Sequence, residues 1–343
     1  MMRVFLNHTP QAREHYYGER ALRRLEQLAE VRLNTQQEPL SAAQMVQAAQ
    51  GCQVIVGARV PAVPADVFEQ LPELLAFCRV AVDVNNIDLS AASRHGVLVT
   101  RATPGFGPSV AEWIVGVMVD MSRGISCAVG QYRQGRVPSV RMGRQLAGAV
   151  LGIVGYGTIG RYLAKLGQAL GMDVLVHDPY QPDVGPCRRA DTLAAVLAEA
   201  DYVICLAASV PETAGLFDAA AFAAMKPGAC FVNAARGELV DEPALLQALD
   251  EGRLAACALD VGRAADQMPS LALAMHPKVI ASPHIGGLTP QAVEHQALDT
   301  VEQVRAILQG KVPHEALNAQ DAYRFHRLSR AGPCANAPVS RCP

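Results

Sequence analysis

Short apolar runs alternate along the chain with segments whose apolar residues recur every three or four positions. Runs of this length are typical of buried strands, and the periodic segments are typical of amphipathic helices. Strands are predicted at 3–6, 31–33, 53–58, 74–80, 97–100, 149–154, 173–178, 202–207, 229–234, 255–260 and 279–282. Helices are predicted at 10–29, 41–50, 65–70, 88–94, 110–132 and 290–308. This alternation indicates an α/β protein with parallel sheets covered on both faces.

Proline and glycine divide this pattern into two α/β units. They cluster in TPGFGP (103–108), which marks a break before the long predicted helix. The chain has 343 residues, a length that itself suggests about two domains. After about Asn318 it becomes polar and rich in proline and alanine, so we expect residues 321–343 to form a loosely held tail.

Composition excludes several classes of protein. Half of the residues are hydrophobic and 18% are charged, which excludes bulk disorder. The net charge of −2 favours neither nucleic acid nor a membrane as a partner, and no apolar run approaches the length of a membrane span. The start, MMRVFLNHTP, lacks the order of a signal peptide and is interpreted as a first strand.

The nine cysteines form no CxxC pair. Cys52, Cys205, Cys230 and Cys257 lie inside apolar runs, which favours buried free thiols over disulfides or a metal site. We therefore expect a cytoplasmic protein with no metal.

A glycine motif carries the clearest chemistry. Gly155, Gly157 and Gly160 form GxGxxG directly after an apolar strand and directly before a helix. The first glycine permits a tight turn, the second lets the backbone approach a pyrophosphate, and the third lets helix pack on strand. The helix N-terminus then presents N–H groups to the phosphates.

An acid follows the motif at the expected place. Asp178 ends the next strand, 18 residues after Gly160, where a carboxylate accepts both ribose hydroxyls and repels a 2′-phosphate. The motif thus predicts NAD rather than NADP. A glycine turn in some other α/β protein is the alternative.

Several ordered segments resemble the D-isomer-specific 2-hydroxyacid dehydrogenase family, which includes phosphoglycerate, glycerate, formate and phosphite dehydrogenases. The similar segments span roughly residues 50–312 and are NNIDL (85–89), TPG with SVAE (103–112), the glycine motif, VPETAGLFDAAAFAAMKPGACFVNAARGELVDEPAL (210–245), ACALDV (256–261) and SPHIGGLT (282–289). The resemblance implies a Rossmann NAD-binding lobe at 102–288, inserted into a flavodoxin-like substrate-binding lobe at 1–101 and 289–320. It also implies an active site between the lobes and a homodimer built on helix 110–132.

Two catalytic residues follow from the resemblance. Arg236 in NAARGELVDE matches the arginine that orients a 2-oxo acid and polarises its carbonyl. His284 in SPHIGG matches the general acid/base that protonates the forming alkoxide.

The family's glutamate is missing, because Ala265 stands at the aligned position in DVGRAADQMPS. Three interpretations stay open. Asp266, one residue further on, pairs with His284. Alternatively, His284 works without a carboxylate, with Gln267 nearby. In the third, the chain binds NAD with little turnover.

A second departure lies in the substrate-binding lobe. CRVAVDVNNID corresponds to a segment that is commonly glycine-rich and binds the substrate carboxylate through backbone amides. Ala81 and Asp83 occupy glycine positions, with Val82 between them. Asp83 either faces solvent or meets a substrate that carries a hydroxyl or amine. Arg59 is a candidate anion contact or an ordinary surface arginine, whereas the arginines of 133–144 are interpreted as a solvated face.

The resemblance assigns the remaining cofactor contacts. They are Thr158 and Ile159 beside the phosphates, Ala207 and Thr213 after the strand at 202–207, Ala234 and Ala235 under the nicotinamide with Arg236 as a further contact, Asp260 at the carboxamide, and His284, Gly286 and Gly287 beside the ring.

Together these features predict an NAD-dependent dehydrogenase of a small D-2-hydroxy acid. An NAD(H)-binding sensor or corepressor-like protein on the same scaffold is the alternative, since fold alone does not fix function.

Overall fold

The computed structural model describes residues 2–330, which belong to two compact units. Among the described residues, unit 1 comprises 2–105 and 290–330, and unit 2 comprises Phe106–Thr289. Unit 2 is therefore an insertion in unit 1. The sequence-based boundaries, before residues 102 and 289, lie four residues and one residue earlier than these divisions.

Unit 1 contains a parallel sheet of five strands in the order β2-β1-β3-β4-β5. The strands are β1 (Arg3–Leu6), β2 (Glu30–Leu33), β3 (Val54–Gly57), β4 (Ala76–Arg79) and β5 (Leu98–Arg101). The helices are α1 (Pro10–Tyr16), α2 (Glu19–Glu26), α3 (Ala42–Ala49), α4 (Ala65–Glu69), α5 (Leu89–Arg94), α13 (Pro290–Leu308) and α14 (Tyr323–Arg330). This strand order is flavodoxin-like and confirms the predicted fold of this lobe.

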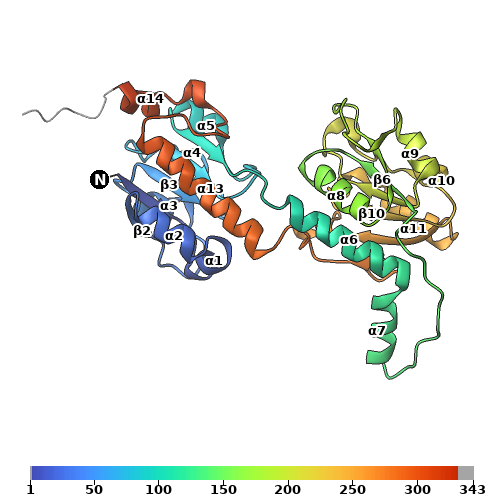
Figure 1. Cartoon of the computed structure of the whole chain (residues 1–343). Helices are drawn as coiled ribbons and strands as arrows, with labels where there is room; N and C mark the ends of the chain where they lie inside the picture. The colour runs from blue at the N-terminus through green and yellow to red at the C-terminus, as the bar shows by residue number, and fades with distance from the viewer. Residues whose placement is uncertain (1, 331–343) are drawn as a thin grey trace, which may run out of the picture. The chain divides into compact units, whose positions relative to one another are not determined.

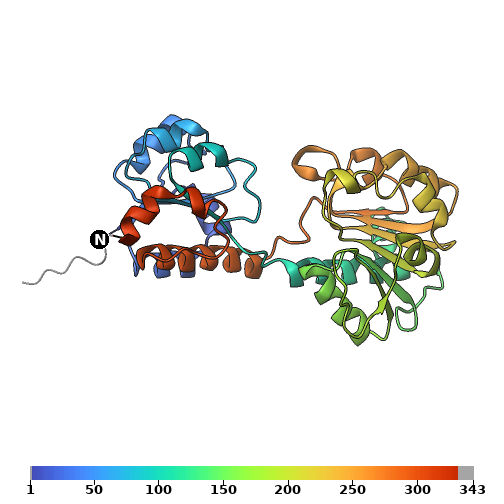
Figure 2. The same cartoon turned by 90° about the horizontal axis from the view of Figure 1, so that it is seen from above.

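Alternating side chains of the strands bury both faces of this sheet. Val4 and Leu6 pack on one side with α2 and α13, whereas Phe5 packs on the other with α3, α4 and α5. Figure 2 shows α13, in orange, on one side of the sheet and α3, α4 and α5, in lighter blue to cyan, on the other.

Two predictions for unit 1 need correction. The predicted helix 10–29 is broken, because Gly18 adopts a φ of 83° that interrupts the helical backbone between α1 and α2. The predicted loose tail begins too early, because α14 packs Phe325, 1% exposed, into the core of unit 1. The rest of that tail, 331–343, lies outside the described residues.

Unit 2 contains a parallel sheet of seven strands in the order β12-β11-β10-β9-β6-β7-β8. The strands are β6 (Val150–Val154), β7 (Asp173–His177), β8 (Arg188–Arg189), β9 (Tyr202–Cys205), β10 (Ala229–Asn233), β11 (Leu254–Leu259) and β12 (Val279–Ala281). The helices are α6 (Gly107–Arg123), α7 (Ile125–Arg133), α8 (Thr158–Ala169), α9 (Leu193–Glu199), α10 (Ala219–Ala224), α11 (Glu242–Asp250) and α12 (Leu271–Ala274). Helices α6 and α8 cover one face, and α9, α10 and α11 cover the other (Figure 1).

The single helix predicted at 110–132 is two helices. Gly124 takes a left-handed φ of 67°, which ends α6 and starts α7 in a new direction. None of the residues of α7 is buried, and this helix projects away from the body of unit 2 (Figure 1). Within residues 2–330 no single helix is long and apolar enough to cross a membrane; only α6 and α7 together, bent by 69°, reach that length and composition.

The cysteines agree in part with the prediction. Cys52, Cys205, Cys230 and Cys257 are buried free thiols, as their apolar surroundings indicated, whereas Cys127 on α7 is exposed. Among the described residues no group of three or more His, Cys, Asp or Glu side chains could hold a metal ion.

Candidate active site

The glycine motif lies where the strand order of unit 2 reverses, between β6 and β9, at the carboxyl ends of the strands. Gly155 has a φ of 102°, and a Cβ there would lie 2.5 Å from the carbonyl carbon of Leu206. A Cβ on Gly160 would lie 2.4 Å from the oxygen of Gly155. Both positions therefore require glycine for close packing.

Gly157 differs from these two glycines, because a Cβ there would meet no atom within 4 Å. It precedes the first turn of α8, whose N-terminal N–H groups have no side-chain cap. Open space in front of uncapped N–H groups suits a pyrophosphate. Thr158 is exposed and Ile159 half-buried in the same turn. The residues present thus fit a dinucleotide.

Asp178 follows β7 and fixes the glycine loop. Its Oδ2 accepts the backbone N–H of Tyr156 at 2.7 Å, and its Oδ1 accepts that of Tyr180 at 2.9 Å. Each oxygen retains a lone pair for a further donor, as contact with ribose hydroxyls requires. Asp178 therefore has a structural task that the sequence did not indicate, and the ribose contact stays a prediction.

Ala207 and Thr213 lie in the loop after β9. The Thr213 hydroxyl donates to the carbonyl of Ala208 at 2.6 Å and accepts the N–H of Val210 at 3.0 Å. Its observed contacts thus shape its own loop, and its contact with the cofactor stays a prediction.

Arg236 is exposed in a turn after β10, beyond half-buried Ala234 and buried Ala235. Asn233, 1% exposed, holds this turn: its Nδ2 donates to the carbonyl of Arg236 at 2.8 Å, and its Oδ1 accepts the N–H of Ala235 at 3.0 Å. Asn233 therefore sets the backbone from which the guanidinium projects. Sequence reasoning missed it, although an amide at the end of an apolar strand is a usable signal.

His284 is half-buried in the segment after β12 and has a positive φ of 56°. Asp260, 3% exposed at the end of β11, holds this segment. Its carboxylate accepts Ser282 Oγ at 2.6 Å and the N–H groups of Ile285 at 2.9 Å and Gly286 at 2.7 Å. These donors flank His284 on both sides, so Asp260 positions the turn that carries it. Its predicted contact with the carboxamide stays a prediction.

Close packing leaves no room for side chains beside this turn. A Cβ on Gly286 would lie 2.8 Å from Asp260 Oδ2, and one on Gly287 would lie 3.2 Å from Cβ of Phe106. The glycines thus let the His284 turn lie against Asp260 and the start of α6.

We expect Asp260→Asn to lower kcat/KM for 2-oxo acids about 100-fold. The amide NH₂ of asparagine would face N–H groups that the carboxylate accepts in the unaltered chain, so the turn should shift. A small displacement of His284 would then be costly if it takes part in the reaction. Steady-state kinetics and NADH binding, followed by fluorescence, would test this. Asp241→Asn, which alters the N-cap of α11, is the matched control. A kcat/KM of Asp260→Asn within threefold of that of the unaltered chain would contradict the positioning role of Asp260.

The backbone of the predicted acid lies in the short 3-10 turn Ala265–Gln267. The side chain of Asp266 lies outside the described residues, so its pairing with His284 stays a prediction. Gln267 is exposed, with a φ of 59°. A Cβ on Gly237 would lie 2.3 Å from the carbonyl carbon of Gly262, so the Arg236 turn packs directly against the loop after β11.

The predicted substrate-binding residues of unit 1 follow β3 and β4. Asp83 lies 3.6 Å from Nη2 of Arg59 and 3.4 Å from Nη2 of Arg79, and Val82 is half-buried beside it. Arg79 is a second residue that sequence reasoning missed. Its only signal was a charge inside the apolar run AFCRVAV.

His8 follows β1 and is buried near Arg79. Burial, with smaller effects from Arg79 and Arg13, lowers the pKa of His8 to about 3. The unfolded chain takes up this proton below about pH 6.5, whereas the folded chain does not until near the lowered pKa. Stability linked to His8 is therefore present above pH 6.5 and is lost as the pH falls towards 3.

We expect acidification from pH 7 to pH 5 to cost about 2 kcal/mol of unfolding free energy through His8 alone. His8→Gln should remove that part of the pH dependence. Urea unfolding of both proteins at the two pH values measures the difference. Equal slopes of stability against pH would contradict this assignment.

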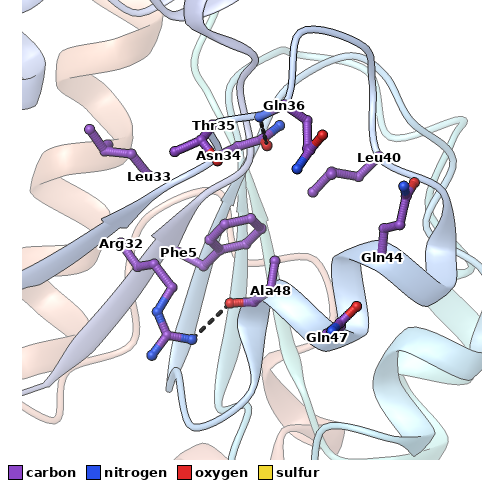
Figure 3. Close-up of a pocket in the computed structure, with 10 residues that line it drawn as sticks. All are labelled: Phe5, Arg32, Leu33, Asn34, Thr35, Gln36, Leu40, Gln44, Gln47 and Ala48. Carbon is purple, nitrogen blue, oxygen red and sulfur yellow. Dashed lines mark hydrogen bonds between the residues drawn. The ribbon is translucent and has the colours of Figure 1, made fainter.

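A cavity of about 370 Å³ opens in unit 1 beside β1 and β2. Figure 3 shows Phe5 and Leu40 at its apolar part, with Gln36, Gln44 and Gln47 around it. None of the predicted residues Arg59, Val82 and Asp83 lines it. It is therefore separate from the candidate substrate contacts.

Comparison with known proteins identifies the family. The family model described as D-isomer specific 2-hydroxyacid dehydrogenase, NAD binding domain, matches residues 115–286. (S)-sulfolactate dehydrogenase from Chromohalobacter salexigens is 36% identical over 251 residues, covering 72% of this chain and 81% of the relative. The chain belongs to the D-isomer specific 2-hydroxyacid dehydrogenase family.

A further relative and a solved structure of a dehydrogenase are also similar to this chain. D-3-phosphoglycerate dehydrogenase from Mycobacterium tuberculosis is 36% identical over 265 residues, covering 75% of this chain and 49% of that relative, so the chain spans about half its length. D-lactate dehydrogenase from Lactobacillus jensenii, a structure with NAD⁺, superposes with a TM-score of 0.80 at 26% identity, covering 92% and 99% of the two chains. Unit 2 is thus the NAD-binding Rossmann domain of the family.

Proposed function

We propose that the chain is an NAD-dependent dehydrogenase that interconverts a small D-2-hydroxy acid and its 2-oxo acid. The observation that carries the proposal is the preorganised edge of unit 2. There the turn of Arg236 and the turn of His284 are each held by a buried polar side chain, Asn233 and Asp260. Fixed polar groups at the carboxyl ends of adjacent parallel strands are the arrangement a catalytic site needs.

Arg236 binds the substrate in this proposal. Its planar guanidinium donates paired hydrogen bonds to the carboxylate and the adjacent carbonyl oxygen of a 2-oxo acid. The positive charge then stabilises the negative charge that develops on that oxygen during reduction. When bound, the nicotinamide supplies the hydride.

His284 moves the proton. In reduction its protonated imidazole donates to the carbonyl oxygen, and in oxidation its neutral form accepts the hydroxyl proton. Asp266 is the proposed partner of the imidazole, and unit 1 supplies the substrate contacts Arg59, Val82 and Asp83.

NADH oxidation with glyoxylate, pyruvate, hydroxypyruvate and larger 2-oxo acids, from pH 5 to 9, tests the function. We expect turnover with the smaller acids and a product of D configuration by chiral chromatography. An L product would contradict the proposal. NADH binding without turnover would favour the sensor or corepressor-like alternative.

A homodimer is the proposed assembly, with α7 in the contact. Ile125, Val129 and Tyr132 expose 49%, 40% and 64% of their surface, and the helix buries none of its residues. Exposed apolar residues concentrated on a projecting helix indicate a surface that a partner covers. A second copy fits best, since one symmetric contact can cover both helices.

Sedimentation equilibrium tests the dimer. We expect twice the chain mass of 36.4 kDa for the unaltered protein and a monomer for Tyr132→Glu. Tyr180→Glu, which alters an 83% exposed tyrosine elsewhere on unit 2, is the matched control. A monomeric unaltered protein would contradict the proposal.

The cytoplasm is the proposed compartment. The seven cysteines of the described residues are all free, and five of them are buried. Free thiols persist where the surroundings are reducing.

A further inference from the structure

Asp83 lies between two arginines in unit 1. Its Oδ1 is 3.4 Å from Nη2 of Arg79, and its Oδ2 is 3.6 Å from Nη2 of Arg59. The Arg59 side chain is 70% exposed, that of Asp83 37%, and that of Arg79 only 1%. The carboxylate therefore connects an accessible cation with a buried one.

Arg79 connects the loop after β3 with the loop after β4. Its Nη1 donates to the carbonyl of Ala58 after β3, and its Nε donates to the carbonyl of Asp83 after β4 at 3.1 Å. Burial lowers the pKa of this guanidinium, and the neighbouring Asp83 carboxylate opposes the shift. A buried cation needs a counter-charge, and Asp83 is the one the structure provides.

We propose that Asp83 is an internal counter-ion that fills a two-arginine anion site, so that the chain selects 2-oxo acids without a second negative charge. The inference rests on the proposed function and deepens it. Two guanidinium groups on one carboxylate are suited equally to a phosphate, a sulfonate or a second carboxylate. With Asp83 in place, a second anionic group on the substrate meets a carboxylate instead.

The same geometry favours substrates that donate a hydrogen bond. Each Asp83 oxygen makes one long contact to an arginine and retains lone pairs for another donor. A substrate hydroxyl supplies that donor without adding charge. Two of the relatives are named for phosphoglycerate and for sulfolactate, and each of these acids carries a second anionic group. The proposal therefore gives this chain a different substrate preference from the one those names indicate.

Substrate ratios provide the first test. NADH oxidation is compared for glyoxylate and hydroxypyruvate against oxaloacetate and 3-phosphohydroxypyruvate. The unaltered chain should prefer the first pair, and Asp83→Ser should raise kcat/KM for the second pair relative to the first about tenfold or more. Asp83→Asn removes the charge without opening space and should act in the same direction.

Asp66→Ser, an equal change of charge at an exposed site on α4 of unit 1, should leave the ratio unchanged. An unaltered chain that prefers the doubly charged acids would overturn the inference. So would an Asp83→Ser ratio equal to that of the control.

Inorganic phosphate gives a second test that does not depend on turnover. Phosphate should raise the Tm of full-length Asp83→Ser by about 2 °C or more, because ligand binding to the folded state stabilises it. It should not do so for the unaltered chain, or for Asp83→Ser combined with Arg59→Gln. If no 2-oxo acid is turned over, the proposed function fails, and phosphate binding alone decides whether Asp83 masks the site. Equal Tm shifts with phosphate in the unaltered chain and in both variants would overturn the inference.

Discussion

Replacing Arg236 by glutamine should lower kcat/KM for 2-oxo acid reduction about 1,000-fold. Glutamine is uncharged and has no planar fork, so it neither pairs with the carboxylate nor stabilises charge on the carbonyl oxygen. The backbone of the turn should persist, because Asn233 bonds the main chain of Arg236 and not its side chain. Arg236→Lys keeps the charge without the fork and should retain an intermediate rate.

The kinetics are paired with NADH binding, which should change little if Arg236 acts mainly on the substrate. Arg188→Gln is a suitable control, since this arginine of unit 2 forms ion pairs with Asp173 and Glu199 on the surface. Arg188→Gln should keep full activity. If Arg236→Gln reduces glyoxylate within tenfold of the unaltered rate, Arg236 is excluded as the substrate anchor.

The two-unit α/β fold could be predicted because buried parallel strands produce apolar runs that are visible in one sequence. Every predicted strand is present, with no end shifted by more than two residues. Helix breaks were harder to predict. Gly18 and Gly124 interrupt helical patterns through positive φ angles, and a single glycine in a periodic segment does not reveal its conformation.

The cofactor motif could also be predicted, because GxGxxG between a strand and a helix is a local pattern. The contacts by which Asn233, Asp260 and Arg79 hold the site could not. Asn233 and Asp260 act through bonds to backbone groups, and Arg79 bonds a loop 21 residues away. Such contacts depend on which strands are neighbours, and the spacing of residues along one chain does not encode that.

The departure from the family at Ala265 shows the same limit. The sequence shows that the glutamate is missing. Which side chain takes its place beside His284 depends on the backbone conformation of the loop after β11. That loop is tightly folded, since Gly262 donates its N–H to the carbonyl of Gln267 at 2.7 Å. The position of Asp266 thus depends on the conformation of this turn, which an alignment with the family's motif does not reveal.

His284→Asn should lower kcat for reduction by about 100- to 10,000-fold, because no group remains to donate the proton to the carbonyl oxygen. Asparagine is chosen because it tolerates the left-handed backbone, and His284 has a φ of 56°. The turn should therefore survive with its bonds from Ile285 and Gly286 to Asp260. Loss of activity would then report on the imidazole rather than on the loop.

The pH profile separates a lost proton donor from a damaged site. Reduction takes up a proton, so the rate of the unaltered enzyme should decline on the alkaline side. The residual rate of His284→Asn should lack this decline between pH 5 and 9, while NADH still binds. His276→Asn, which alters a histidine paired with Asp250, serves as the control and should keep both the rate and the decline. A variant that is slow but retains the same alkaline decline would assign proton transfer to another group.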